Sequence, residues 1–377
     1  MIKSDSHSNS QFRVRVGLVA LLGVAALLGA ACASDDESAD SGQSSDGMPT
    51  VLVTTSILGD VVSNLLGDAA TVETLMPMGA DPHEFQASAQ QVEAMVSADV
   101  LVTNGAGFEE GLEQNIEAAE GDGTPVCVAI DSVDTIEYAD SGHSDDKSHS
   151  DDEGHSDDDG HSDDDGHSDD DGHSDDDGHS DDDGHSDDDG HSDDEDHSHD
   201  HSGDDPHFFT DPARMAAAAE GIADCIIDAV PALDTEEVQT SVDAYVAELE
   251  ALDAEVEEVL AGIPEERKVL VTNHEVFGYF ADRYGFEVAG AVIPSLSTQS
   301  EASAADLAEL AELLETEGVP AVFADTSSPN QLAEALASEA GGVQVVELFS
   351  ESLGPDGGET YVVMVRSNAE RIAEALA

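Results

Sequence analysis

The stretch Met76-Pro77-Met78-Gly79-Ala80-Asp81-Pro82-His83-Glu84-Phe85 contains the tripeptide Asp-Pro-His, which returns at Asp205-Pro206-His207. Proline fixes its own φ and pushes the residue before it towards extended backbone. Each tripeptide therefore predicts a stiff loop that presents an imidazole. Asp-Pro is also a common start of a turn, and on that alternative each histidine would simply be exposed. The repetition favours the first interpretation.

Most of the 16 histidines lie outside the part of the chain that is expected to fold. His7 precedes an export leader, and twelve others lie in a low-complexity run. The histidines left for the fold are His83, His207 and His274, the last within Thr272-Asn273-His274-Glu275. Because neutral imidazole is a common ligand of transition metals, we predict that these three rings meet and bind one ion.

The charge of the chain is strongly negative, with 87 acidic residues against 10 Lys and Arg and a net charge of −77. Nucleic acid is excluded as a partner, because no basic patch can form. An acidic surface suits the gathering of cations or life in a salty medium that screens self-repulsion. We expect the low-complexity run to gather cations and the folded part to be adapted to a salty medium.

Residues 1–32 have the pattern of a bacterial lipoprotein signal peptide. Arg13 and Arg15 precede the apolar residues 16–28, which are too few to span a bilayer. Small residues then lead to Cys32, as in a lipobox. We therefore expect lipidation of Cys32 and anchoring to the outer face of the cell membrane, an extracytoplasmic location. The alternative is an ordinary secretory leader with a chance cysteine. Residues 33–49 predict a flexible tether.

From Thr50 onwards, short apolar strands alternate with helical spacing, which is typical of an α/β fold with parallel sheets. We predict two such lobes, at 50–233 and 263–377, joined by a long rigid helix at 234–262. Helices are also expected at 88–96 and 108–118. Ligands of parallel sheets bind beyond the carboxyl ends of strands, and His83 follows one predicted strand while His274 follows another. The metal site is accordingly expected in the cleft between the lobes.

An insertion at 140–204 interrupts the first lobe. Its repeated unit is His-Ser-Asp-Asp-Asp-Gly, and without apolar residues to bury it predicts disorder. Its side chains predict weak binding of metal at many places, and the alternative is a solvated spacer. The histidines of the run are His143, His149, His155, His161, His167, His173, His179, His185, His191, His197, His199 and His201.

Several motifs together resemble the zinc- and manganese-binding receptor lipoproteins of metal ABC importers, and the insertion resembles the His-rich loop of the zinc-binding branch. They are Thr55–Asp60, Gly79–Phe85, Asp205–Phe208, Asn273–Tyr279 and Phe349–Ser352. The resemblance implies a receptor, not an enzyme, that is a monomer and delivers Zn²⁺ to an importer permease. It also implies that His83, His207, His274 and Glu351 are the ligands, although the family usually has aspartate at the position of Glu351. Asp325 and Glu275 are the alternative carboxylates for the fourth ligand.

Three imidazoles and one carboxylate suit zinc, whereas manganese prefers more oxygen ligands. A manganese receptor of the same family, a zinc-dependent hydrolase and a calcium-binding surface adhesin are the alternatives. Against a hydrolase, the sequence has no HExxH motif and no nucleophile elbow. Outside the cell membrane, Cys127 and Cys225 could form a disulfide or remain two thiols.

Overall fold

The computed structural model describes residues 47–137 and 203–377. The predicted signal peptide, Cys32 and the twelve histidines of the insertion lie outside these described residues. Both predicted lobes belong to one unit, which extends from Met48 to Ala377.

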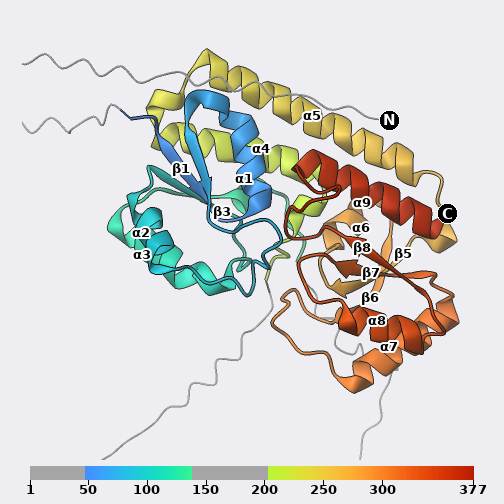
Figure 1. Ribbon diagram of the computed structural model, residues 1–377. Coiled ribbons are helices and arrows are strands. Elements are labelled where there is room, and N and C mark those ends of the chain that lie inside the picture. The colour runs from blue at the N-terminus through green and yellow to red at the C-terminus, as the bar shows by residue number, and fades with distance from the viewer. Residues whose placement is uncertain (1–46, 138–202) are drawn as a thin grey trace, which may run out of the picture. The chain divides into compact units, whose positions relative to one another are not determined.

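The first lobe is built on a parallel four-stranded sheet of order β2-β1-β3-β4 (Figure 1). Its strands are β1 (Thr50–Val53), β2 (Thr71–Thr74), β3 (Val100–Thr103) and β4 (Val126–Val128), and its helices are α1 (Ser56–Leu66), α2 (Ala89–Ser97), α3 (Glu113–Asp122) and α4 (Pro212–Ala229). Side chains alternate across the sheet. Leu52 and Leu101 pack with residues of α2 and α3, whereas Val51 and Val53 pack with α1 and α4.

The second lobe repeats this plan with a parallel sheet of order β6-β5-β7-β8. Its strands are β5 (Val269–His274), β6 (Glu287–Ile293), β7 (Ala321–Asp325) and β8 (Gln344–Leu348), and its helices are α6 (Gly278–Tyr284), α7 (Ala304–Glu317), α8 (Gln331–Glu339) and α9 (Tyr361–Leu376). Val271 and Val322 pack with α7 and α8, while Leu270 and Phe323 lie on the opposite face of the sheet and pack in the core that includes α5 and α9.

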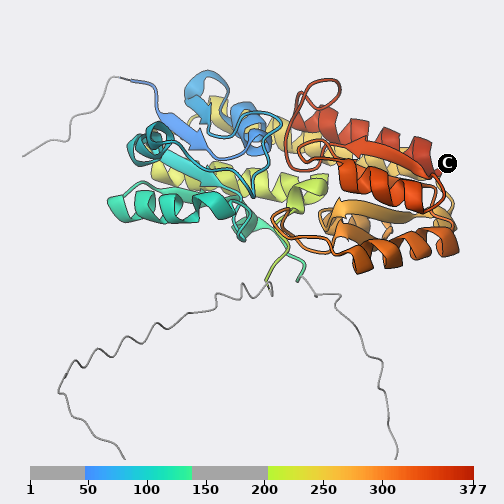
Figure 2. The same cartoon turned by 60° about the horizontal axis from the view of Figure 1, so that its bottom comes forward.

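The outer faces of the two sheets have separate small cores, but their other faces share one large core. Helix α5 (Glu236–Leu260) contributes Tyr245, Leu249 and Val256 to that shared core and runs past both lobes (Figures 1 and 2). Arg283 Nε of α6 donates to Asp253 of α5 at 2.9 Å. The lobes are therefore fastened to a common helical layer, which limits their relative motion.

The helix expected at 108–118 was placed wrongly. It begins at Glu113 and runs to Asp122, after a 3₁₀ turn at Glu110–Leu112. The reason is the buried Glu109, whose carboxylate accepts from the backbone N–H of Asn104 at 2.7 Å and from the hydroxyl of Thr54 at 2.6 Å. Folding this side chain back onto its own loop produces a tight turn before the helix can start.

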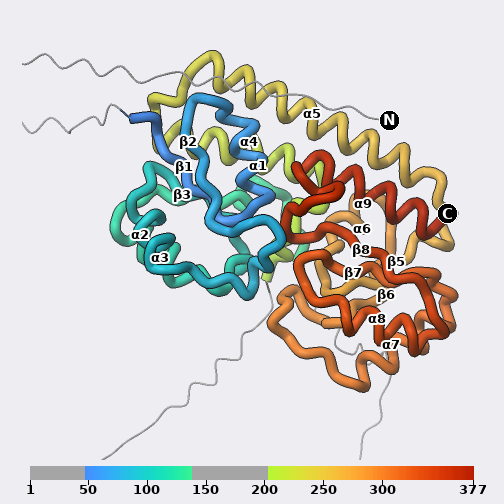
Figure 3. The backbone as a smooth tube through the Cα atoms, viewed as in Figure 1, coloured from blue at the N-terminus to red at the C-terminus, as the bar shows by residue number. Residues whose placement is uncertain are grey.

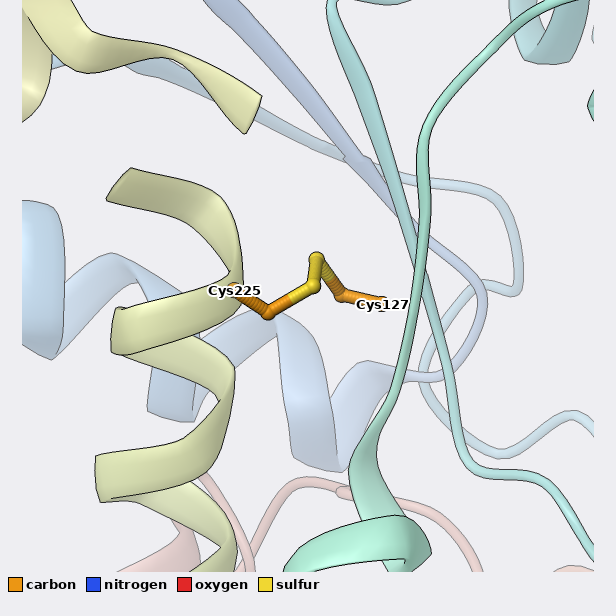
Figure 4. Close-up of a disulfide and its surroundings, with 2 residues drawn as sticks. All are labelled: Cys127 and Cys225. Atoms are coloured by element: carbon orange, nitrogen blue, oxygen red, sulfur yellow. A yellow bond between two sulfur atoms is a disulfide. The ribbon is translucent and has the colours of Figure 1, made fainter. Parts of the chain in front are cut away.

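Cys127 of β4 and Cys225 of α4 form a disulfide in the structure, with Cα atoms 5.9 Å apart (Figure 4). It fastens α4 to the edge strand of the first sheet, and the two cysteines stand on either side of the insertion in sequence. Among the described residues, no helix is both long enough and apolar enough to cross a bilayer.

Candidate metal centre

The four predicted ligands come from four separate loops or strand ends, which belong to both lobes. His83 lies in the loop between β2 and α2, and His207 directly precedes the 3₁₀ turn Phe208–Thr210. His274 is the last residue of β5, and Glu351 follows β8. The loop after β2 meets the loop after β8, where the N–H of Gly79 donates to the carbonyl of Leu353 at 2.9 Å (Figure 3).

The four side chains converge on one point. Their candidate ligand atoms all lie within 4.8 Å of one another, and all four residues are buried. Oε1 of Glu351 lies 2.8 Å from Nε2 of His83, 3.0 Å from Nε2 of His274 and 3.3 Å from Nε2 of His207. Three imidazole nitrogens thus surround a single carboxylate oxygen, more than its two lone pairs can serve well.

His207 is held by the first residue of its own tripeptide. Oδ1 of Asp205 accepts from the backbone N–H of His207 at 2.9 Å and lies 2.7 Å from its Nδ1. A donor at Nδ1 leaves the lone pair of Nε2 directed at the centre, which is the tautomer a metal requires. Asp205 is buried, and its carbonyl accepts from the hydroxyl of Tyr279 at 2.7 Å.

His83 has a different environment. Its Nδ1 lies 3.3 Å from Oε1 of Glu110, a charge contact rather than an aligned hydrogen bond. Its backbone carbonyl accepts from Nε2 of Gln299, in the second lobe, at 2.8 Å. The backbone N–H of His83 donates to Asp81, whose other oxygen accepts from the hydroxyl of Thr298 at 2.7 Å.

The glutamate loop closes the opposite side of the centre. The hydroxyl of Ser352 accepts from the N–H of Gly79 at 2.8 Å, and the N–H of Leu353 donates to the hydroxyl of Ser56 at 3.0 Å. Within the described residues, Oε2 of Glu351 and Nδ1 of His274 are buried without a hydrogen-bond partner. An unsatisfied buried carboxylate oxygen beside imidazoles is a position that a cation would satisfy.

The charges of the centre shift each other's pKa values. Burial alone would lower the pKa of His83, but the negative charge of Glu351, with help from Glu110, outweighs it and raises this pKa to about 10. Burial would likewise lower the pKa of His207, yet Asp205 raises it. Burial would raise the pKa of Glu351, but His274 and His83 hold it well below its usual value. The metal-free centre therefore holds protons where a cation would otherwise sit.

Aromatic rings form an apolar wall beside the centre. Phe108 meets the ring of His83 edge-on at 5.2 Å between centroids and the ring of His207 at 5.6 Å. On the solvent side, a cavity of about 750 Å³ is lined by His83, Glu110, Pro206, Gln299 and other residues. This cavity gives the centre an approach from solvent.

Two carboxylates considered from the sequence do not join the cluster. Asp325 is buried at the end of β7 and accepts from the backbone N–H of Ser327 at 2.9 Å and from its hydroxyl at 2.6 Å. Glu275 lines a different cavity, with Phe277 and Asp282. Sequence reasoning missed the supporting roles of Asp205, Glu110 and Gln299. Only the aspartate carried a signal, since it begins the repeated tripeptide.

The donor set fits a divalent transition metal. Neutral imidazole nitrogens and a carboxylate are the ligands that zinc takes in four-coordinate sites, and one ring already has its outer nitrogen on a buried carboxylate.

Comparison with known proteins places the chain in a family. The family model described as zinc-uptake complex component A, periplasmic, matches residues 51–375. The chain belongs to this family. Its members are solute-binding components of ABC importers, so the chain is a binding protein and not an enzyme.

Individual relatives cover nearly the whole chain. The zinc-binding protein TroA of Treponema pallidum is 30% identical over 366 residues, which are 95% of this chain and 97% of TroA. The manganese-binding lipoprotein MntA of Halalkalibacterium halodurans is 24% identical, over 89% of this chain and 92% of MntA. The solved structure of TroA aligns with a TM-score of 0.67 at 27% identity, over 88% of this chain and all of the chain in that structure. A manganese-bound periplasmic protein from Candidatus Liberibacter asiaticus, at 18% identity and a TM-score of 0.65, shares the fold.

Proposed function

We propose that the protein is an extracytoplasmic receptor that binds one Zn²⁺ through His83, His207, His274 and Glu351 and delivers it to the permease of an ABC importer. The observation that carries the proposal is the convergence of three imidazole nitrogens on one buried carboxylate oxygen. The ion is the cargo of this protein, so the site has to hold it and later release it.

The donor set favours zinc over manganese. Some relatives are named for zinc and others for manganese, so sequence similarity alone does not identify the metal. Zn²⁺ accepts a tetrahedral set of three nitrogens and one oxygen, whereas Mn²⁺ binds best to oxygen-rich sites. In the Irving–Williams order of affinities, Cu²⁺ and Ni²⁺ bind such nitrogen and oxygen sites about as well as zinc or better, so we expect both ions to compete with zinc in vitro.

Attachment to the membrane would follow from the sequence around Cys32. Several relatives are named lipoproteins, including MntA and the substrate-binding lipoprotein PsaA of Streptococcus anginosus. A lipidated Cys32 would keep a monomeric receptor near its permease, and the His- and Asp-rich insertion would collect metal weakly near the cleft.

Metal competition on the protein without residues 143–201 tests the proposal. We expect one tightly bound zinc per chain that manganese does not displace. His274→Ala should lower zinc affinity by a factor on the order of 100 to 1,000, because four ligands share the roughly 10–16 kcal/mol of a zinc site. Glu275→Gln, next in sequence but outside the cluster, is the matched control and should change affinity by less than about threefold. Loss of tight binding on deletion of the repeats, or displacement of zinc by manganese, would contradict the proposal.

A further inference from the structure

The turn after β6, residues 295–300, is stiffened by its own serines. The hydroxyl of Ser295 accepts from the N–H of Ser297 at 3.1 Å and from the hydroxyl of Ser300 at 2.9 Å. The hydroxyl of Ser297 accepts from the N–H of Gln299 at 3.2 Å. A turn held in this way presents the side chains of Thr298 and Gln299 in fixed positions.

Both of these side chains cross to the first lobe and contact the surroundings of His83. The hydroxyl of Thr298 donates to Oδ2 of Asp81 at 2.7 Å. Nε2 of Gln299 donates to the carbonyl of His83 and to Oε2 of Glu110, each at 2.8 Å. Glu110 in turn has its other oxygen 3.3 Å from Nδ1 of His83. One exposed amide thus fastens both the backbone of a ligand and the carboxylate beside its ring.

The same turn is rooted next to another ligand. His274 pairs with Ile293 in the parallel ladder of β5 and β6, and the N–H of Glu275 donates to the carbonyl of Ser295 at 3.0 Å. Any shift of this strand pair away from the first lobe would therefore withdraw His274 and the turn together.

The turn also lies at the open side of the centre. Ser297, Gln299 and Ser300 line the cavity of about 750 Å³ that reaches His83. On the opposite side, a buried bond from the N–H of Leu353 to Ser56 and a partly buried bond between Gly79 and Ser352 close the glutamate loop. Gln299 is exposed, so its contacts are the easier ones to break.

We infer that Gln299, together with Thr298, is a positioning residue that latches the His83 loop to the second lobe and sets the rate at which the bound ion leaves. The inference rests on the proposed function. Opening the latch frees His83 first, because the contacts that hold His207 are buried, whereas those of Gln299 are exposed or only partly buried.

Zinc dissociation from the full chain tests the latch. Zinc-loaded protein is mixed with excess chelator, and the dissociation rate is compared between wild type and Gln299→Ala. Losing two hydrogen bonds at an exposed position should raise this rate roughly three- to tenfold. The association rate should change by less than about twofold. Since Gln299 is exposed, the variant should fold, and circular dichroism checks this. Gln344→Ala, another exposed glutamine at the start of β8, should leave both rates unchanged.

A double-mutant cycle with Glu110→Ala then asks whether Gln299 acts through this carboxylate, in which case the combined effect is smaller than the product of the single effects. If wild type binds one zinc but Gln299→Ala releases it at the wild-type rate, the latch is wrong and the proposed function stands. An equal rise of the association and dissociation rates would leave zinc affinity unchanged. That result would also overturn the latch, because it would mean that Gln299 only blocks the path of the ion. If wild type binds no zinc, the proposed function itself fails.

Discussion

Asp81 and Asp205 begin the same tripeptide, and each accepts a hydrogen bond of 2.9 Å from the backbone N–H of its own histidine. Beyond that shared bond they differ. The oxygen of Asp205 that holds the backbone of His207 also holds its ring, and the residue is buried. Asp81 turns its second oxygen to Thr298 in the other lobe. One copy of the motif fixes a ligand ring within a lobe, and the other connects a ligand loop to the opposite lobe.

If both histidines bind the ion as proposed, this difference gives them unequal parts in metal exchange. His207 is held by buried contacts and should remain a fixed ligand throughout. His83 is held by contacts between the lobes that can be broken, so its loop should be the element that yields when the ion leaves. On the proposed function, the two copies of one tripeptide would therefore supply a permanent ligand and a releasable ligand to the same centre.

Asp205→Asn should give the largest effect among tests of this comparison. The asparagine oxygen can still accept both hydrogen bonds, but the charge that strengthens the bond to the His207 ring is gone. Partners of this kind typically contribute a factor of 10 to 100 in metal affinity, and we expect a loss in roughly that range. Isothermal titration with zinc in competition with a chelator measures it. Asp204→Asn, the exposed neighbour, is the control. A change of less than about threefold in Asp205→Asn would show that the ring needs no such partner.

The second test is the pH dependence of zinc binding. Near neutral pH the metal-free centre holds a proton on His83, whose pKa is raised to about 10. Zinc must displace that proton, so affinity should rise about tenfold per pH unit between about pH 7 and 9 for each proton released. Calorimetric titration with zinc in buffers of different ionisation enthalpy measures the number of protons released per zinc bound. An affinity that is flat over this range would mean that His83 is already neutral.

The stability of the metal-free protein should follow the opposite trend. The raised pKa of His83 contributes stability that is complete below about pH 6.5 and is lost as the pH rises towards 10. The lowered pKa of Glu351 contributes stability that is present above about pH 4.5 and is lost in more acidic solution. The gap in melting temperature between zinc-loaded and metal-free protein should therefore widen from about pH 6 to about pH 8.

Much of the fold could be predicted because its signals are local. Val51 and Val53 lie in a short apolar run before a helical segment, and this pattern is enough to indicate a buried parallel strand. The helix expected at 88–96 is α2, which Ser88 caps in a capping box with Gln91. The helix after Phe108 was misplaced because a buried Glu109 reshapes its own loop, a tertiary effect that local spacing does not carry.

The metal centre, like the fold, has features that the sequence could predict and others that it could not. The histidines could be found by elimination and by their repeated tripeptide, and the structure brings them together with Glu351. The bond between Asp81 and Thr298 could not be predicted, since Thr298 lies 217 residues from Asp81 in the chain. Only the packing of two lobes decides that one aspartate faces its own histidine ring and the other faces a hydroxyl across the cleft.

Asp81→Asn should give the smallest effect, and it separates the two tripeptides most directly. The asparagine carbonyl can accept the N–H of His83, and its NH₂ group can donate to the hydroxyl oxygen of Thr298, so both contacts survive without the charge. Zinc affinity should fall by less than about threefold, with any change confined to the dissociation rate, as measured by the chelator assay. The same substitution at two positions of the same motif would then differ in its effect on zinc affinity by a factor of about three or more. Equal losses at both positions would instead mean that the aspartates act only through the shared bond to the histidine backbone.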